Sequence, residues 1–277
     1  MTLSVARPVD GSLDAVFRAG KMGCRVDARA VAPLELRGPF RATNLPPQYF
    51  VRNVTGGICG GDRLRTRIEV GEGAAIRIAT TSASKVCAMP SAPATSALEL
   101  VAHRGSVAVY ESHATILQRD SDFSQRVRLD VRPGAGVLFS DIVMLGRLAH
   151  GERLVFRRFA SELLVQSGAA ATPSFIERYE VRPERDPTLD AALGGYGVIG
   201  SLYALGTSAD GVDLDALAAW CAEDCRAYAG ADALPNGAGI VVRFLAPDGW
   251  TARSFVRSAS RCALSGRDAR RNADGQP

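Results

Sequence analysis

The chain has 277 residues, of which 47% are hydrophobic and 22% charged, the composition of an ordinary globular protein rather than a disordered or fibrous one. A net charge of only +4, arginines interleaved with acidic residues and an aromatic content of 6% argue against nucleic-acid binding. No apolar run approaches the roughly 18 residues of a membrane span, and charges interrupt the first 20 residues, where a signal peptide would be apolar. We therefore expect a cytoplasmic protein that binds neither nucleic acid nor membranes.

The first half of the chain has the pattern of a β-protein. Between about residues 25 and 165, short runs of alternating apolar residues are separated by Gly, Pro and Asp, which predicts strands. A unit of strand, glycine turn and second strand occurs three times, with its turn at Gly73, Gly105 and Gly134. Stacked units of this kind form a layered, solenoid-like β-structure, although an antiparallel sandwich of hairpins has the same spacing. The pattern alone favours neither.

The C-terminal third differs because helical periodicity appears in it. Asp213 is a suitable N-cap for a helix over residues 214–228, whose apolar positions follow helical spacing. A shorter helix is expected near residues 188–193, which gives about two helices in this third of the chain. Residues 239–245 and 250–256 are predicted to be strands on either side of a turn.

The domain organisation is predicted to be simple. No linker divides residues 1–256, which we expect to form a single β-rich domain. Residues 257–277 are polar and basic and are expected to be disordered. The six cysteines include no C-x-x-C pair and are too few for a disulfide scaffold in a chain of this size.

Sequence signatures of common enzymes are missing. The chain has no P-loop, no G-x-G-x-x-G, no G-x-S-x-G and no H-E-x-x-H motif. The three histidines, His103, His113 and His150, are too scattered to indicate a zinc site. A Ser/His/Asp group that meets only in space would leave no such signature, so a hydrolase stays an alternative.

The densest local feature is the glycine-rich segment Gly56–Asp62. Its glycines let the backbone turn tightly and let another segment approach closely. Asp62 would bind backbone amides, a cation or a partner's arginine, or simply cap the turn. Cys59 within the segment is either a soft ligand or a small filler. The structural-loop glycines are Gly56, Gly57, Gly60 and Gly61.

Two further segments carry isolated charges. Lys85 is one of only two lysines in an arginine-rich chain, which is either a chance of composition or a need for a compact ammonium group. In Gly146–Glu152, Arg147 and Glu152 lie near glycine-bounded turns, where they form a structural ion pair or part of a docking surface.

Four blocks in a fixed order resemble the urease accessory protein UreD family, called UreH in some organisms. Gly56–Asp62 is similar to G-G-[ILV]-x-G-G-D, and Thr80–Lys85 is similar to T-x-x-A-[ST]-K. Tyr110–Gln125 resembles a stretch that ends in D-S-x-F-x-Q. Asp141 with Gly146–Glu152 resembles D-x-x-x-x-G-R-x-A-x-G-E. Together the blocks cover about residues 50–155.

The resemblance implies a maturation factor without catalytic activity of its own. Members of the family bind apo-urease and join it to UreF and, through UreF, to the GTPase UreG, which delivers nickel. The implied fold is mainly β, distorted and layered, with a couple of helices. An internal passage with polar and acidic side chains is the implied nickel route, so no tightly bound cofactor is expected, only transient nickel.

Six residues are candidates for partner binding or nickel transit on this basis. One of them marks a departure from the family pattern, because Ser112-His113-Ala114 stands where the family has P-[DE]-P. His113 is then either a neutral nickel-compatible ligand or an ordinary hydrogen-bonding residue. The alternative function is a hydrolase on a β scaffold with Asp62, His113 and Asp141 as acid and base groups. The six candidates are Asp62, Lys85, His113, Asp141, Arg147 and Glu152.

Overall fold

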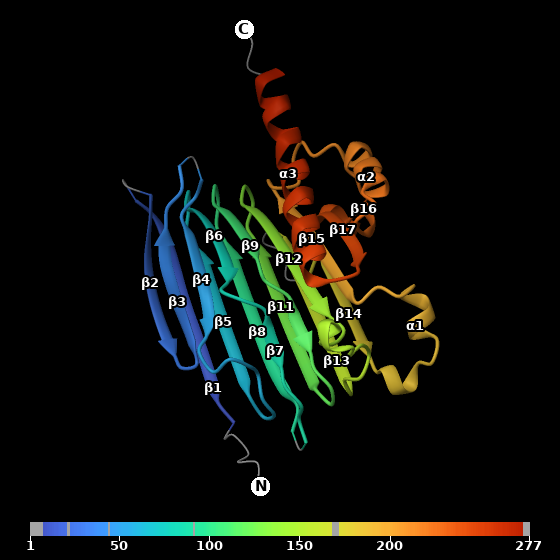
Figure 1. Cartoon of the computed structure of the whole chain (residues 1–277). Coiled ribbons are helices and arrows are strands. Elements are labelled where there is room, and N and C mark those ends of the chain that lie inside the picture. Colours follow the sequence, from blue (N-terminus) through green and yellow to red (C-terminus); the bar gives the residue numbers. More distant parts are fainter. Residues whose placement is uncertain (1–7, 21–22, 44, 91, 168–171, 274–277) are drawn as a thin grey trace.

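The structure is a computed structural model, and it describes residues 8–20, 23–43, 45–90, 92–167 and 172–273. For residues 263–273 it describes only the backbone. Strands make up 51% of the protein and wind into a β-solenoid of about four turns (Figure 1). The prediction of a mainly β, layered fold is confirmed, and the solenoid rather than the hairpin sandwich is the form it takes.

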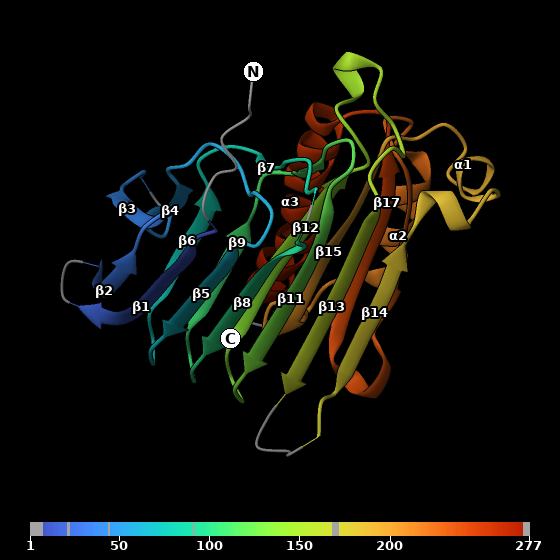
Figure 2. The same cartoon turned by 90° about the horizontal axis from the view of Figure 1, so that it is seen from below.

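Two sheets lie face to face and form the body of the solenoid (Figure 2). The seven-stranded sheet has the order β14-β13-β11-β8-β5-β1-β2. Its strands β5, β8, β11 and β13 are parallel, while β2 and β14 are antiparallel edge strands. The strands are β1 (Asp10–Gly20), β2 (Gly23–Val31), β5 (Arg63–Val70), β8 (Ala94–Ala102), β11 (Asp122–Val131), β13 (Arg158–Ser167) and β14 (Phe175–Val181).

The second sheet has ten strands, eight of them in the order β16-β17-β15-β12-β9-β6-β4-β3. Strands β4, β6, β9 and β12 are parallel, and β15, β17 and β16 follow as an antiparallel extension. Short strands β7 and β10 pair beside β12. The strands are β3 (Leu34–Phe40), β4 (Gln48–Asn53), β6 (Ala75–Thr80), β7 (Ser84–Val86), β9 (Val107–Glu111), β10 (Thr115–Leu117), β12 (Gly136–Met144), β15 (Val198–Gly206), β16 (Tyr228–Ala233) and β17 (Gly239–Ala246).

The glycine turns connect the two sheets. Three strands of the seven-stranded sheet pass through Gly73, Gly105 and Gly134 into strands of the other sheet, in the pairs β5–β6, β8–β9 and β11–β12. The three glycines have φ of 66°, 70° and 79°, a conformation that side chains with a Cβ rarely adopt. The repeated unit seen in the sequence is therefore one turn of the solenoid.

Alternation along β12 divides its side chains between two apolar cores. Val137, Phe139 and Val143 belong to the large core between the sheets. Leu138 and Ile142 belong to a second core on the outer face of the ten-stranded sheet. Odd-numbered residues of β12 therefore point into the solenoid.

Helices cover that outer face. Helix α3 (Gly249–Ala273) lies along β12, β15 and β17, and α2 (Leu214–Glu223) packs against β16 (Figure 1). Asp213 caps α2 as predicted, since its Oδ1 accepts from the Ala216 N–H at 3.0 Å. The short α1 (Leu189–Ala192) lies near the expected position. Among the described residues, no helix combines the length and apolar character needed to cross a membrane.

Two expectations for the C-terminal third are wrong. Residues 250–256, expected as a strand, belong to α3, and residues from 257 onward continue this helix to Ala273. Asp248 caps the helix by accepting from the Thr251 N–H at 2.8 Å. The buried residues of α3 follow a helical spacing that the polar composition obscured, and they are Ala252, Phe255, Val256 and Ala259. Residues 274–277 of the expected disordered tail lie outside the described part of the chain.

The predicted end of the preceding helix is also wrong. Helix α2 ends at Glu223, five residues earlier than predicted, and residue 228 begins β16.

Candidate functional site

Two rows of polar side chains face each other between the sheets. In the ten-stranded sheet, register places Asp141 of β12 beside Ser201 of β15, and Ser201 beside Arg243 of β17. In the seven-stranded sheet, Gln125, Ser161 and Tyr179 occupy neighbouring positions on β11, β13 and β14.

The side-chain amide of Gln125 connects the two rows. Gln125 Nε2 donates to Asp141 Oδ2 at 2.5 Å and to Ser161 Oγ at 3.1 Å. The Asp141 carboxylate thus has a neutral amide as its side-chain partner instead of a cation. A carboxylate held in this way keeps its charge uncompensated when ionised.

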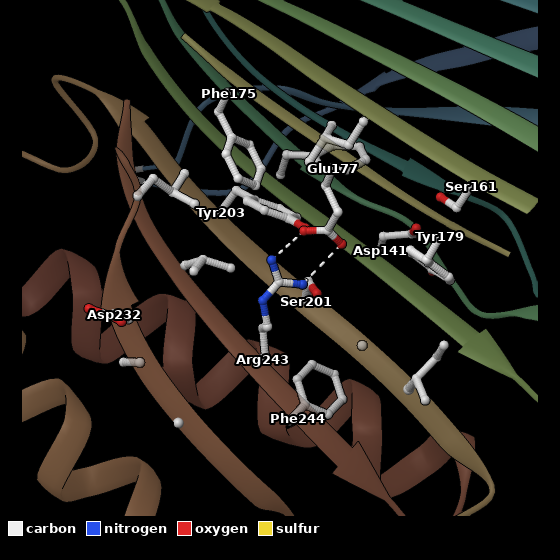
Figure 3. Close-up of a pocket in the computed structure, with 18 of the residues that line it drawn as sticks. Asp141, Ser161, Phe175, Glu177, Tyr179, Ser201, Tyr203, Asp232, Arg243 and Phe244 are labelled. Carbon is white, nitrogen blue, oxygen red and sulfur yellow. Dashed lines mark hydrogen bonds and ion pairs between the residues drawn. The ribbon is translucent and has the colours of Figure 1, made fainter. Parts of the chain in front are cut away.

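An ion pair lies farther along the same interior (Figure 3). Arg243 binds Glu177 with both guanidinium NH2 groups, one of them at 2.9 Å from Oε1. Tyr203 also donates to Glu177 Oε2, at 3.3 Å. These side chains come from β14, β15 and β17, so the antiparallel extension of the solenoid builds this part of the site.

Two cavities meet at Asp141. The larger, of about 1080 Å³, lies between β14 and the β15–β17–β16 extension and contains Glu177 and Arg243. The smaller, of about 170 Å³, is lined by the Thr80–Lys85 segment, His113 and Gln125. The residues common to both linings are Val127, Phe139 and Asp141.

Burial sets the protonation of Asp141. Burial between the sheets raises its pKa to about 6, while the Gln125 hydrogen bond opposes the rise and nearby Glu177 adds to it. The same desolvation, together with Asp141, raises the pKa of Tyr110 to about 12. At neutral pH the site therefore presents an ionised carboxylate among neutral phenols.

Asp62 has a different environment. Its side chain is buried, and its oxygens accept from the Val9 N–H at 3.0 Å and the Cys59 N–H at 2.8 Å. The carboxylate thereby joins the N-terminal segment to the glycine-rich loop. Of the roles considered for Asp62, the geometry fits the anchoring of this loop.

Lys85 and His113 lie with Asp141 around the smaller cavity. Lys85 is exposed on β7. The His113 N–H donates to Thr80 Oγ1 at 2.9 Å, which ties two of the recognised blocks together. Burial lowers the pKa of the His113 imidazole, and Arg253 and Arg257 of α3 lower it further, so the ring is neutral at pH 7.

Arg147 and Glu152 bind each other in the turn after β12. Arg147 Nε donates to Glu152 Oε2 at 2.8 Å, and a second guanidinium nitrogen binds Oε1. Gly146 has a φ of 149°, and a Cβ there would collide with the Glu152 backbone. The Arg147 hydrogen bond is the main cause that lowers the pKa of Glu152 to about 2. The geometry is that of a structural ion pair that closes the turn.

The sequence analysis missed part of this site. Glu177, Tyr179 and Arg243 lie outside the recognised blocks, in strands whose other inward residues are apolar. The available signal was a charge at an inward position of an apolar strand, as in Gly239–Ala246, where Arg243 interrupts the run. Among the described residues, no three His, Cys, Asp or Glu side chains are grouped closely enough to hold a metal ion.

Comparison with known proteins identifies the family. A family model described as UreD urease accessory protein matches residues 9–274. The chain belongs to the UreD family of urease accessory proteins. The predicted resemblance is thus confirmed, and it extends well beyond the blocks at residues 50–155.

Individual UreD proteins are similar over most of their length. Urease accessory protein UreD of Haloarcula marismortui is 34% identical over 255 residues, which cover 90% of this chain and 84% of that protein. UreD 2 of a Synechococcus species is 32% identical over 69% of this chain and 73% of its own. UreD of Mycolicibacterium gilvum is 31% identical over 77% of this chain and 78% of its own.

Membership in the UreD family bears on the hydrolase alternative. The family is one of urease accessory proteins. His113 and Asp141 do line one cavity, but Asp62 is not among its lining residues, and the Asp62 carboxylate binds backbone amides. The three acid and base groups of the alternative therefore do not form one site.

Proposed function

We propose that this protein binds apo-urease, recruits UreF and through it the GTPase UreG, and guides Ni²⁺ through its own interior during urease maturation. The family supports the accessory role. The route is supported by one observation above all, the position of the Asp141 carboxylate where two cavities meet.

The chemistry of the polar rows suits a passing cation. An ion in transit needs ligands that hold it weakly, and single carboxylates with water do this better than a closed Cys/His cage. Asp141, with a pKa of about 6, is ionised at neutral pH, and within the described part of the chain its one side-chain hydrogen-bond partner is the Gln125 amide. Glu177 offers a second carboxylate in the larger cavity, and Arg243 competes for it.

The remaining candidates have supporting roles in this proposal. His113 keeps a free lone pair because it is neutral, but the nearby charges of Arg253 and Arg257 disfavour a cation beside it. Asp141 is therefore the main ligand of the proposed route, and His113 a secondary one. Lys85 on the rim of the smaller cavity is available to a carboxylate of a partner.

The experiment is maturation of urease with Asp141→Asn or Glu177→Gln in place of the wild-type protein. Asn has nearly the size of Asp, so the packing stays and only the charge is lost. Asp14→Asn, on the exposed face of β1, is the matched control. We expect less nickel per urease with Asp141→Asn and normal nickel with Asp14→Asn.

Binding must be measured separately from nickel transfer. A pull-down with apo-urease and UreF should give equal recovery for wild-type protein and Asp141→Asn. Normal nickel loading by Asp141→Asn would contradict the route, whereas failure of the wild-type protein to recover either partner would contradict the scaffold role. Reduced nickel loading with His113→Ala would support a ligand role for His113, and unchanged loading would contradict that role.

A further inference from the structure

Two cysteines from different recognised segments lie side by side at the glycine-rich loop. Residues 58 and 86 form a parallel β-bridge, in which the Ile58 N–H donates to the Lys85 carbonyl at 2.7 Å and the Cys87 N–H donates to the Ile58 carbonyl at 2.9 Å. Cys59 and Cys87 each follow one member of the bridge. Neighbouring strands lie about 4.8 Å apart, which is within the Cα separation that a disulfide spans.

The two thiols are neighbours. Cys59 is close enough to raise the pKa of the Cys87 thiol through its charge and through hydrogen bonding. Gly57 makes room for it, because a Cβ at that position would lie 2.8 Å from Cys87 Sγ. Both cysteines are free and half-buried, so a small oxidant reaches them.

Their environment assigns different roles to the two sulfurs. Burial and the neighbouring Cys59 raise the pKa of Cys87 to about 11, and Lys85 opposes the rise. Cys87 therefore remains a thiol at neutral pH and donates its proton towards Cys59. We therefore assign Cys59 as the sulfur that meets the oxidant first and Cys87 as the sulfur that closes the disulfide.

We propose that Cys59 and Cys87 form an oxidant-sensitive dithiol that hydroperoxides convert into an intramolecular disulfide. Cys59 gives up its proton as its sulfur attacks an oxygen of hydrogen peroxide, which breaks the O–O bond and gives Cys59 sulfenic acid and a first water. The Cys87 sulfur then attacks the Cys59 sulfur, a water molecule leaves with the Cys87 proton, and the S–S bond forms. In total, two thiols lose two electrons and peroxide becomes two waters.

The disulfide has a structural consequence at the smaller cavity. Gly56, Gly57 and Ile58 on one side and Lys85 on the other line this cavity. A covalent link between residues 59 and 87 fixes these two segments to each other, where a β-bridge and a thiol contact hold them in the reduced protein. The dithiol chemistry does not depend on the proposed nickel route, so the two are tested separately.

The chain contains a second pair of cysteines that serves as an internal control. Cys221 and Cys262 are close enough for their charges to interact, but Cys221 is 1% exposed on the buried face of α2. Burial raises the pKa of Cys221 to about 11. We expect this pair to stay reduced under conditions that oxidise the exposed Cys225.

The test is peptide mapping of the full-length protein after treatment with a few equivalents of hydrogen peroxide. Free thiols are alkylated and the digest is analysed by mass spectrometry without reduction. We expect a peptide pair linked through Cys59 and Cys87 in monomeric protein, reversed by dithiothreitol. Oxidation of Cys225 with no Cys59–Cys87 link would overturn the proposal, because it shows that the oxidant was active.

Single substitutions assign the order of the steps. In Cys87→Ser, Cys59 should accumulate as sulfenic acid and react with dimedone, whereas in Cys59→Ser the label on Cys87 should be absent. Equal labelling of both variants would contradict the assigned roles. Circular dichroism establishes that each variant is folded, and Cys221→Ser should form the Cys59–Cys87 link as the wild-type protein does.

Discussion

Asp62 and Asp141 are both acidic residues of recognised blocks, yet their surroundings differ in kind. Asp62 has two backbone amides as donors, so its charge is used to hold a loop. Asp141 has the Gln125 amide as a side-chain donor and lies where two cavities meet, so its charge faces open space. A family motif therefore does not tell a structural carboxylate from a functional one, whereas its position, between two chain segments or at a cavity, does.

The largest effect is expected at Asp62. Asp62→Ala leaves the amides of Val9 and Cys59 without their acceptor in a buried site, which should lower the free energy of unfolding by about 4 kcal/mol. Urea unfolding measures this. Asp14→Ala on the exposed face of β1 should change stability by less than about 0.5 kcal/mol, and an equal loss in both variants would contradict the anchoring role.

Substitution of Asp141 should stabilise the protein, in contrast to substitution of Asp62. Its pKa is about 6 in the folded protein, above the value of 3.8 for a free side chain, so the folded state loses stability as pH rises from about 4 through 6. Asp141→Asn removes this cost and should raise the free energy of unfolding at pH 8 by about 3 kcal/mol.

At about pH 3 and below, the wild-type protein and Asp141→Asn should be nearly equally stable, because the wild-type carboxyl is then mostly neutral in both states. Urea unfolding at about pH 3 and about pH 8 gives the comparison. A variant that is less stable than the wild-type protein at pH 8 would contradict the account.

The pair of Glu177 and Arg243 should give a smaller effect. A double-mutant cycle with Glu177→Gln and Arg243→Gln should yield a coupling of about 1 kcal/mol, because the Arg243 side chain is half exposed and solvent screens the pair. Thermal unfolding of the four proteins measures it. A coupling near zero would show that Arg243 does not hold Glu177, whose carboxylate would then be as available to a cation as that of Asp141.

The smallest effect is expected at the turn that Arg147 and Glu152 close. The pKa of Glu152 falls from 4.5 to about 2 on folding, so its contribution to stability is present above pH 4.5 and disappears as pH drops towards 2. Glu152→Gln should therefore unfold at a slightly higher pH during acid titration. High salt should weaken the difference because Arg147 is exposed to solvent, and an effect at neutral pH as large as that of Asp62→Ala would contradict this ranking.

The sequence allowed the layered β-fold to be predicted because its signals are local. The backbone at Gly73, Gly105 and Gly134 has a positive φ, which favours glycine. The repeat can therefore be recognised in the amino-acid sequence. Helix α3 was missed because small and polar residues dilute its apolar stripe, and only contact with the sheet shows which face is buried.

The candidate site was predictable only in part, for a related reason. Asp141 lies in a block that resembles the family. Its position where the two cavities meet, however, depends on strands β14, β15 and β17, which are distant in sequence. From the sequence alone, Glu177 and Arg243 look like ordinary charges at exposed strand positions. The strand register places both in the lining of the larger cavity. Pairing of Cys59 with Cys87 likewise depends on the bridge between residues 58 and 86.

The pH dependence of nickel loading tests the central claim most directly, with urease matured by wild-type protein or Asp141→Asn at several values between pH 5 and pH 8. If the ionised Asp141 carboxylate carries the ion between the cavities, loading by the wild-type protein rises through about pH 6. Loading by Asp141→Asn then stays low throughout, although it binds apo-urease normally. Equal loading by both proteins across this range would contradict the claim.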